Sequence, residues 1–397
     1  MNRAYPVFAV TPKAERVVRA GHPWVYGEEV TKTEGAYAPG DIVDVCTQKG
    51  KWLGAGFVND ASKIRVRLLS RNANDVYDEA FWRRRVRYAL DYRRTVAAGH
   101  FQACRLIFGE ADGFPGLTVD RYNDVLCAEV LCRGIDRIKD MLFRLLLEEL
   151  HGEVTAVYER SDSPIRAKEG LEGVVRWAVG EAAGKTVITE NGINYAVDYI
   201  HGQKTGFFLD QQENRAAVAR IAAGKTVLDC FTHTGAFALN AAAGGAKRVT
   251  AVDVSAEALR AAEENAALNG QAVELIKADV FDLLTGMAEK GRCGYDFIIL
   301  DPPAFTKSGA TVKNAYRGYK EINRRAMQLL PRGGYLATCS CSHFMTDELF
   351  RKMLAEAAAD AAVQLRQLYV GRQAPDHPIL WGVPETDYLK FYIFQVV

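Results

Sequence analysis

Hydrophobic and polar residues alternate in two different ways along this chain. In "GDIVDVCTQKGKWLGAGFVN" (residues 40–59) the two kinds alternate between glycines, which is typical of short strands joined by turns. From about residue 190 onward, short apolar runs alternate instead with stretches of helical periodicity. We expect strands in "KTVLDCF", "RVTAVDVS", "VELIKADVF", "YDFIILDPP" and "GGYLATCS". A helix is expected in "AEALRAAEENAALNG", with Ser255 as its N-cap. This order predicts the α/β class, with a doubly wound, mostly parallel Rossmann-like sheet in the C-terminal half.

The first half of the chain predicts two smaller modules. A small β-rich, barrel-like domain is expected over residues 1–72. "DEAFWRRRVRYALDYRRTV" predicts a helix, "LTVDRYNDVLCAEVL" a hairpin that turns at Asn123-Asp124, and "RIKDMLFRLLLEEL" a second helix. Residues 73–188 are therefore expected to form an α+β middle domain, and residues 189–397 the doubly wound domain. The end of the chain, "YLKFYIFQVV", predicts a final hairpin at the edge of that sheet.

Composition narrows the class of protein. A chain of 397 residues is too long for one ordinary core, and 49% hydrophobic with 25% charged residues is typical of a soluble globular protein. The start of the sequence lacks the apolar core of a signal peptide, and no apolar run is long enough to span a bilayer. We therefore expect a cytoplasmic protein without a membrane partner. The formal net charge of +1 means that any nucleic-acid-binding surface must be a local basic patch.

The chain has eight cysteines, which in a cytoplasmic protein are expected to be free thiols, catalytic groups or metal ligands. Six of them show no paired C-x-x-C spacing, so a zinc ribbon is disfavoured and no metal is expected. The other two, Cys339 and Cys341, are separated by a single residue and directly follow a predicted strand.

Four aspartates stand at the ends of successive predicted strands: Asp229, Asp253, Asp279 and Asp301. In open α/β sheets, ligands bind outside the carboxyl ends of the strands, so these acids indicate one binding site. An acid at the end of the second strand, here Asp253, typically accepts hydrogen bonds from ribose hydroxyls. The first turn, "DCFTHTGAF", has the single glycine Gly235 and lacks the G-x-G-x-x-G cradle for a pyrophosphate. A ligand with ribose and adenine but no phosphates fits better, and S-adenosylmethionine is the common one.

Five segments carry a family resemblance: "KTGFFLDQQENR", "LDCFTHTGAFAL", "VTAVDVSAEAL", "LDPPAF" and "TCSCSHFM". On these segments the chain resembles the class I methyltransferases that modify large-subunit ribosomal RNA. It is most similar to their cytosine carbon-5 branch, which carries a small middle domain and an N-terminal PUA module, a compact RNA-binding barrel. "RVVRAGHPWVYGEEV" resembles that module. The resemblance implies an enzyme that forms 5-methylcytidine in large-subunit ribosomal RNA with S-adenosylmethionine as cofactor.

The resemblance also implies which residues bind the cofactor. They are Lys204, Thr205, Phe208, Asp210 and Arg215 before the first strand, and Asp229, Phe231, Gly235, Asp253, Asp279 and Asp301 at the strand ends. A second interpretation of "DQQENR" is helix capping, because Asp210 and Glu213 have capping-box spacing. The two interpretations are compatible, since an exposed helix start can also face a cofactor.

The paired cysteines suit the chemistry of this branch. Carbon 5 of cytosine becomes nucleophilic only after a thiolate adds to carbon 6, and an acid near ring nitrogen 3 takes up charge. Asp301, held between a strand and two prolines, suits the acid. Residues two apart in a strand point to one side, so both Cys341 and Cys339 are candidate nucleophiles, and the resemblance favours Cys341. Related enzymes carry a further cysteine after Asp-Pro where this chain has Ala304, which leaves Cys339, His343 or water to remove the carbon-5 proton.

Several alternatives remain open on the sequence. Cys339, Cys341 and His343 form a C-x-C-x-H metal clip without an evident fourth ligand, and the cysteines are otherwise inert buried thiols. A ribosomal RNA guanine N-methyltransferase needs no cysteine, and a non-catalytic RNA-binding assembly factor needs no chemistry at all. The arginines at 83, 84, 85, 87, 93 and 94 form either a solvated helix face or a phosphate-contacting stripe. The sequence also leaves open a homodimer and does not identify the target nucleotide.

Overall fold

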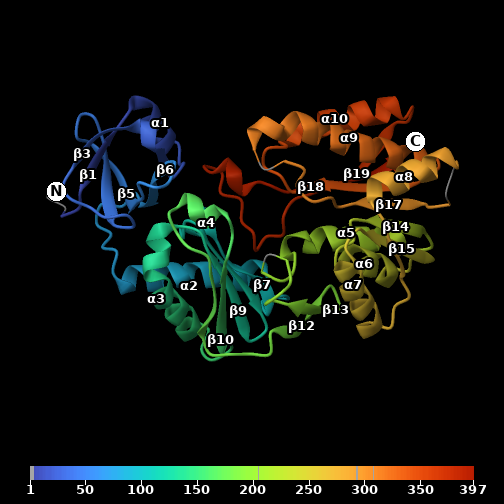
Figure 1. Ribbon diagram of the computed structural model, residues 1–397, viewed down its shortest axis with the longest axis horizontal. Helices are drawn as coiled ribbons and strands as arrows, with labels where there is room; N and C mark the ends of the chain where they lie inside the picture. Colours follow the sequence, from blue (N-terminus) through green and yellow to red (C-terminus); the bar gives the residue numbers. More distant parts are fainter. Residues whose placement is uncertain (1–3, 204, 292–293, 307) are drawn as a thin grey trace. The chain divides into compact units, whose positions relative to one another are not determined.

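The computed structural model describes residues 4–203, 205–291, 294–306 and 308–397. The chain divides into two compact units (Figure 1). Unit 1 comprises Met1–Thr186, Val197–Phe207 and Pro375–Thr386, and unit 2 comprises Val187–Ala196, Phe208–Ala374 and Asp387–Val397. The three-domain division at 72/73 and 188/189 stays a prediction. Across the described ranges, no helix has both the length and the apolar character needed to cross a bilayer.

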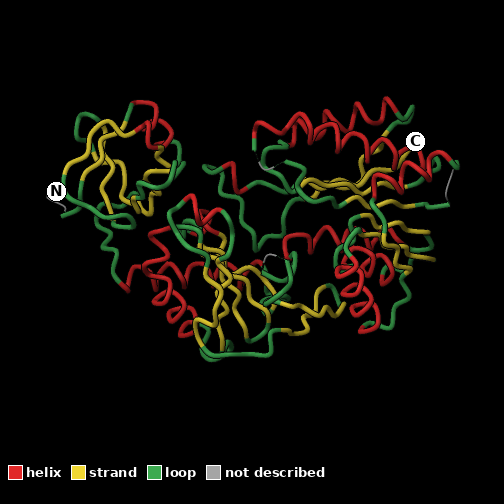
Figure 2. Tube along the Cα trace, viewed as in Figure 1, coloured by secondary structure: helices red, strands yellow, loops and turns green. Residues whose placement is uncertain are grey.

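Unit 1 begins with a six-stranded sheet in the order β2-β6-β5-β4-β1-β3. Its strands and helix are β1 (Val7–Val10), α1 (Pro12–Arg19), β2 (Trp24–Tyr26), β3 (Val30–Glu34), β4 (Ile42–Thr47), β5 (Trp52–Val58) and β6 (Ile64–Ser70). Figure 2 shows that strands and loops make up most of this region. The predicted β-rich module is therefore confirmed. Its interior is apolar and includes Phe8, Val45 and Val66, all completely buried.

The rest of unit 1 is built on a five-stranded sheet in the order β11-β10-β9-β8-β7. The elements are α2 (Glu79–Val96), β7 (Ala103–Phe108), β8 (Leu117–Tyr122), β9 (Val125–Val130), α3 (Arg133–Glu149), β10 (Ala156–Ser161), α4 (Ile165–Lys168) and β11 (Val174–Val179). Helices α2 and α3 pack against each other and contribute to one apolar core with the sheet. The hairpin predicted at Asn123-Asp124 is confirmed, and Asn123 takes the positive φ angle of 56° that such a tight turn uses.

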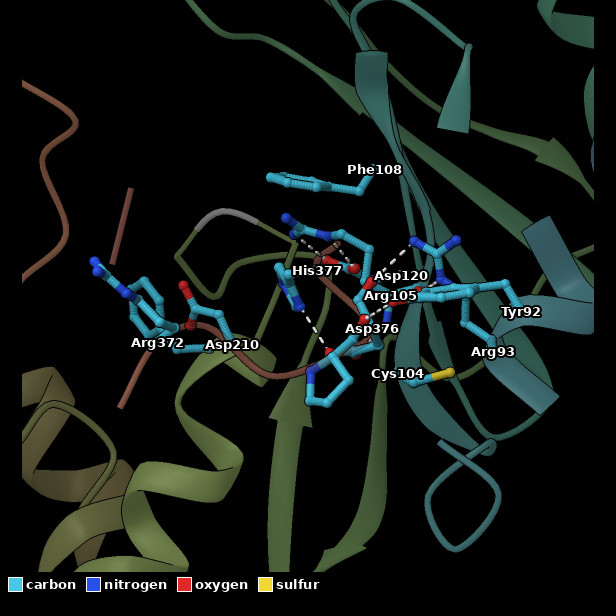
Figure 3. A network of polar contacts seen from close by, with 12 residues as sticks. Tyr92, Arg93, Cys104, Arg105, Phe108, Asp120, Asp210, Arg372, Asp376 and His377 are labelled. Carbon is cyan, nitrogen blue, oxygen red and sulfur yellow. Dashed lines mark hydrogen bonds and ion pairs between the residues drawn. The ribbon is translucent and has the colours of Figure 1, made fainter. Parts of the chain in front are cut away.

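A segment from the end of the sequence also belongs to unit 1. Residues 375–386, which lie between the last two strands of the chain, are anchored by Asp376 and His377 (Figure 3). Asp376 accepts the backbone N–H of Arg105 at 2.8 Å, and its own carbonyl accepts Arg93 at 2.9 Å. Arg93 in turn donates to both oxygens of Asp112, at 2.5 and 2.8 Å. Local sequence patterns contain no sign of this long-range embedding.

Unit 2 contains a seven-stranded sheet in the order β16-β15-β14-β17-β18-β20-β19, in which the first five strands pair in parallel. The strands are β14 (Thr226–Cys230), β15 (Arg248–Asp253), β16 (Glu274–Lys277), β17 (Phe297–Leu300), β18 (Tyr335–Ser340), β19 (Leu365–Gly371) and β20 (Lys390–Val396). A separate two-stranded sheet, β12 (Lys185–Glu190) with β13 (Ile193–Asp198), precedes them. The predicted doubly wound α/β class is confirmed.

Helices cover both faces of the large sheet. Figure 1 shows α5, α6 and α7 on one face and α8, α9 and α10 on the other. Their bounds are α5 (Gln212–Ala222), α6 (Ala236–Ala243), α7 (Ala256–Leu268), α8 (Val280–Glu289), α9 (Val312–Leu329) and α10 (Asp347–Asp360). Ser255 caps α7 as predicted, accepting the backbone N–H of Ala258 at 3.2 Å. Two separate apolar cores, one on each face, hold the layers together.

One expectation about the element ends is confirmed and one is corrected. The last strand, β20, pairs antiparallel with β19, and the two form the hairpin predicted at the edge of the sheet, with β19 as the outermost strand. The capping-box interpretation of Asp210 and Glu213 is wrong. Helix α5 starts after Gln211 without a side-chain cap, and Asp210 lies in a preceding 3-10 turn (Leu209–Gln211). Its carboxylate instead accepts the hydroxyl of Tyr388 at 2.6 Å.

Candidate active site

The turn between β14 and α6 has an unusual backbone conformation. Phe231, His233 and Gly235 all have positive φ angles, of 63°, 50° and 81°. Positive φ strains residues other than glycine and persists where the surrounding structure enforces it, often at ligand sites. At Gly235 a Cβ would meet the Cβ of Ala262 at 3.0 Å, so space as well as conformation requires glycine. The predicted contacts Phe231 and Gly235 thus lie in one strained turn at the carboxyl end of β14.

Asp253, the last residue of β15, fixes this turn. Its Oδ2 accepts the backbone N–H of His233 at 2.9 Å, and its Oδ1 accepts that of Ser255 at 2.9 Å. A carboxylate offers about four lone-pair sites, so both oxygens can still accept further hydrogen bonds. This is the arrangement that an acceptor for ribose hydroxyls requires.

Asp229 is completely buried near the end of β14. Its Oδ2 accepts the hydroxyl of Thr232 at 2.5 Å and the backbone N–H of Ala238 at 3.0 Å. Its Oδ1 has no hydrogen-bond partner among the described residues. Burial raises the pKa of the carboxyl to about 7, and the nearby charges of Asp301 and Asp253 also raise it. A buried acid with a shifted pKa and an unsatisfied oxygen is typical of a ligand site.

Asp279 follows β16 and is the N-cap of α8. Its Oδ1 accepts the backbone N–H groups of Phe281 at 2.8 Å and Asp282 at 3.3 Å. One side-chain oxygen is thus committed to helix capping, and the predicted contact of Asp279 with an adenine edge stays a prediction.

The segment before β14 brings Phe208 to the strained turn. The ring of Phe208 packs edge-on against the ring of His233, with 5.1 Å between centroids. Arg215 is buried and donates to both carboxylate oxygens of Glu190, at 2.6 and 2.7 Å, and to the carbonyl of Phe208 at 2.9 Å. Arg215 therefore holds the backbone of Phe208 in place, and a direct contact of its guanidinium with the cofactor stays a prediction.

Two of the residues predicted to contact the cofactor, Lys204 and Thr205, are not assigned to the strand-end site. Lys204 lies outside the described residues. Thr205 belongs to unit 1, where it is buried and its hydroxyl donates to the carboxylate of Asp120. The structure therefore does not assign Thr205 to the strand-end site of unit 2, and its contact with the cofactor stays a prediction.

Asp301, the residue directly after β17, and Cys339, inside the adjacent strand β18, form the centre of the site. The Sγ of Cys339 donates to Oδ1 of Asp301 at 2.8 Å. The side-chain amide of Gln211 donates to the same oxygen at 3.2 Å and to the sulfur at 3.5 Å. Burial raises the pKa of Asp301 to about 6, although the hydrogen bond from Cys339 opposes the shift. Burial, followed by the charge of Asp301, raises the pKa of the Cys339 thiol well above its usual range.

The two cysteines are not equivalent. Cys339 lies inside β18 and is completely buried, whereas the strand ends at Ser340 and Cys341 is half-buried beyond it. The loop that carries Cys341 is fixed on both sides. The hydroxyl of Ser340 bonds that of Tyr319 at 3.0 Å, and the hydroxyl of Ser342 donates to a backbone carbonyl at 2.9 Å. The extended conformation that would place both thiols on one side of the strand therefore ends between them.

Sequence reasoning missed three residues of this site: Gln211, Asn214 and Lys390. Asn214 donates to Oε1 of Gln211 at 2.6 Å and so orients the amide that contacts Asp301. The signal for Gln211 was present in "DQQENR", a segment interpreted only as a cap and cofactor contact. The signal for Lys390 was a single charged residue inside the apolar strand "YLKFYIFQVV".

These residues fit S-adenosylmethionine. Asp253 would accept the ribose hydroxyls, the strained turn would lie against the ligand, and the turn lacks the glycine-rich cradle of a pyrophosphate site. Among the described residues, no three His, Cys, Asp or Glu side chains are arranged to hold a metal ion.

Comparison with known proteins shows the family and the fold of the chain. The profile of the S-adenosylmethionine-dependent methyltransferases matches residues 142–383, and that of the PUA-like domain matches residues 8–71. A putative SAM-dependent methyltransferase from Streptococcus mutans shares the fold, with a TM-score of 0.82 and 23% identity over 98% of this chain and 100% of that one. A crystal structure of a putative methyltransferase complexed with SAH has a TM-score of 0.83, also at 23% identity, over 98% of this chain and 100% of that chain.

Two curated relatives are similar over almost their whole length. "Ribosomal RNA large subunit methyltransferase I" of Shewanella denitrificans is 42% identical over 97% of this chain and 98% of its own. The protein of the same name from Klebsiella pneumoniae strain 342 is 38% identical over 99% of both chains. The chain therefore belongs to the family of S-adenosylmethionine-dependent methyltransferases, with an N-terminal PUA-like domain and with S-adenosylmethionine as its cofactor.

Proposed function

We propose that this methyltransferase forms 5-methylcytidine in large-subunit ribosomal RNA through a covalent adduct between Cys341 and the cytosine. The name of the relatives supports the RNA substrate. The observation that carries the choice of base is the pair of thiols at the strand end, with Cys339 bonded to Asp301 and Cys341 half-buried two residues later. A guanine N-methyltransferase would need neither thiol.

In the proposed reaction, Cys341 forms and later releases the covalent bond to the base. The sulfur of Cys341 adds to carbon 6 of a cytosine that has left its stack, which makes carbon 5 nucleophilic. Bound S-adenosylmethionine supplies the electrophilic methyl group that carbon 5 takes up. Loss of the carbon-5 proton and cleavage of the carbon–sulfur bond then restore the ring double bond and release Cys341 as thiolate.

Asp301 is the proposed acid at ring nitrogen 3. With a pKa of about 6, raised by burial, about a tenth of this carboxyl is protonated at pH 7, where an ordinary aspartate is almost entirely ionised. The amide of Gln211, itself held by Asn214, keeps the carboxyl in one orientation.

Cys339 is better suited to hold Asp301 than to attack the base. Because burial and the charge of Asp301 raise its pKa, the thiol stays protonated at neutral pH and donates its hydrogen to Asp301. This supports Cys341 as the nucleophile. Removal of the carbon-5 proton then falls to water or to the exposed His343.

We also propose that helix α2 contributes one local RNA contact and not a continuous stripe. Arg83 and Arg87 form ion pairs with Glu149, at 3.1 and 2.8 Å, and Arg93 is buried against Asp112. Two other arginines line a cavity of about 510 Å3. The residues around this α2 cavity are Asn72, Asp75, Phe81, Arg84, Arg85, Tyr88 and Asp112.

The α2 cavity has the chemistry of a phosphate and base contact. Arg84 forms an ion pair with Asp75, and Arg85 donates to the backbone carbonyls of Leu69 and Gly113. Since Asp112 is already bound by Arg93, the side chains around the cavity leave a net charge of about +1. The ring of Tyr88 is 65% exposed, and an exposed tyrosine can stack on an unpaired base.

The test is nucleoside mass spectrometry of ribosomal RNA from cells with and without the gene, rescued by wild-type, Cys341→Ser or Cys339→Ser protein. We expect loss of one 5-methylcytidine, restored by wild type, partly restored by Cys339→Ser and not restored by Cys341→Ser. Restoration by Cys341→Ser would move the nucleophile to Cys339. Loss of a methylguanosine instead would refute the cysteine mechanism.

A second readout isolates the adduct. RNA carrying 5-fluorocytidine has no carbon-5 proton to lose, so the adduct persists on a denaturing gel. We expect it with wild-type protein and not with Cys341→Ser. Calorimetry with S-adenosylmethionine is the control, because a non-catalytic assembly factor would show no affinity for it.

A further inference from the structure

Lys390 lies directly beside the loop that carries Cys341. Strand β20 runs antiparallel to β18, and Lys390 is the register partner of Ser340, the last residue of that strand. Its position is therefore at the carboxyl ends of the parallel strands, where the site is.

The ammonium group of Lys390 is buried, and its hydrogen-bond partners are backbone carbonyls. The residue is 2% exposed, and its Nζ donates to the carbonyl oxygens of Ser342 at 2.6 Å and Tyr388 at 2.8 Å. None of the described residues forms an ion pair with it. Burying an unpaired ammonium is unfavourable, whereas a neutral donor could join two carbonyls without that penalty. A lysine here therefore indicates a use for the charge itself.

The acids that face Lys390 are engaged by other groups. Asp387 and Asp347 lie 3.4 and 3.7 Å from the guanidinium of Arg372, and Asp347 also accepts the hydroxyl of Tyr392 at 2.5 Å. Besides Asp387, Asp347 and Arg372, one more ionisable group interacts with the charge of Lys390, and this is the thiol of Cys341. Burial lowers the pKa of Lys390 to about 8, so the group is still mostly protonated at pH 7.

We propose that Lys390 is a positioning residue whose buried positive charge holds Cys341 as the thiolate. The thiol proton of Cys341 passes to solvent, and Lys390 keeps all three of its own. Because Nζ donates to the carbonyl of Ser342, the residue after Cys341, the charge is held beside the loop that carries the sulfur. The catalytic meaning of this inference rests on the proposed function of Cys341, but the ionisation of the thiol does not.

The experiment measures the ionisation of Cys341 directly. Full-length protein without RNA is alkylated with iodoacetamide at pH values from about 5.5 to 9.5, and modification of Cys341 is followed by peptide mass spectrometry. An unperturbed thiol has its midpoint near pH 8.5, and the wild-type midpoint is expected at least about one unit lower. A wild-type midpoint at or above 8.5 would overturn the proposal without any variant.

Two variants separate the charge from the hydrogen bonds. Lys390→Gln keeps donors for the two carbonyls but loses the charge, and we expect alkylation of Cys341 at pH 7 to slow about ten-fold. Lys390→Arg keeps the charge, so its profile should stay near that of wild type. Lys225→Met is the matched control, because Lys225 precedes β14 and lies at the opposite ends of the parallel strands.

The outcomes distinguish this inference from the proposed function. A purely structural Lys390 would leave the alkylation midpoint unchanged in Lys390→Gln, which would overturn the inference. If the midpoint shifts as expected but Cys341→Ser still restores 5-methylcytidine in cells, the inference about the thiol stands and the proposed nucleophile fails.

Discussion

Buried charges are arranged differently in unit 1 and at the strand-end site of unit 2. In unit 1, Arg93 faces Asp112 and Arg105 faces Asp120, with both guanidiniums donating to both carboxylate oxygens at 2.5–2.8 Å. At the strand ends of unit 2, Asp229, Asp301 and Lys390 form no ion pair with any described residue. Each of these three groups has a pKa shifted by burial toward neutrality.

This difference separates buried charges that stabilise the fold from buried charges that are suited to catalysis. A compensated pair lowers the free energy of the folded state relative to a broken pair, and it keeps both groups charged. An uncompensated group destabilises the fold, and its pKa moves toward the pH at which proton transfer is useful. Unit 1 therefore resembles a rigid support, and the site of unit 2 resembles a reactive surface.

The largest expected effect comes from breaking a compensated pair. Asp112→Asn leaves Arg93 completely buried without its carboxylate, which should lower the free energy of unfolding by about 3–5 kcal/mol. Urea unfolding measures this loss. The exposed pair of Arg94 and Asp91 is the control, and Asp91→Asn should lower stability by less than about 1 kcal/mol. Equal losses in the two variants would contradict the distinction, as would loss of S-adenosylmethionine affinity in folded Asp112→Asn protein.

A smaller effect of opposite sign is expected at Asp229. Its folded pKa of about 7 lies above the ordinary value of 3.8, so the stability contributed by its protonated form is fully present below about pH 4 and is lost as the pH rises through 7. Asp229→Asn carries no charge and avoids this loss. In urea unfolding without cofactor, the variant should be more stable than wild type by about 2 kcal/mol at pH 5.5, with almost no gain at about pH 3.5. Parallel pH curves for the two proteins would contradict the assignment.

The same physical distinction explains how much the sequence could predict. The fold was accessible because strands and helices are encoded by local periodicity, and parallel strands place Asp229, Asp253 and Asp301 at one edge whatever their exact bounds. The embedding of residues 375–386 in unit 1 was not accessible, because it depends on contacts such as Arg105 with Asp376 that are distant in sequence.

The site was only partly accessible for a related reason. Residue types pointed to Asp301 and to the two cysteines, but their roles depend on where β18 ends, and strand ends are poorly encoded. Gln211 and Lys390 act through the groups that they contact, Gln211 through Asp301 and Lys390 through the loop that carries Cys341. Such roles depend on the burial and the hydrogen-bond partners of individual residues, and these cannot be derived from the sequence alone.

The smallest effect concerns Arg84 and Arg87, two exposed arginines of α2 with different surroundings. Arg87 belongs to a cluster with equal numbers of each charge, formed with Arg83 and Arg144 against Glu79, Glu148 and Glu149. Arg84 lines the α2 cavity beside Arg85, and of these two arginines only Arg84 forms an ion pair with Asp75 there. An RNA phosphate would therefore gain more from Arg84 than from Arg87.

We expect Arg84→Met to weaken the binding of a ribosomal RNA fragment by about three-fold to ten-fold at 0.1 M salt, and to reduce the slope of log affinity against log salt by about 0.7–0.9. Arg87→Met, the matched control, should leave both quantities within error, because Glu149 already neutralises its charge. Fluorescence anisotropy over a range of salt concentrations measures both. Equal losses for the two variants would mean that α2 attracts RNA through its overall charge, and the α2 cavity would then have no special role. A loss with Arg84→Met alone would mean that the distinction between compensated and uncompensated charges also holds within unit 1. The least compensated arginines of unit 1 would then form its RNA-binding surface.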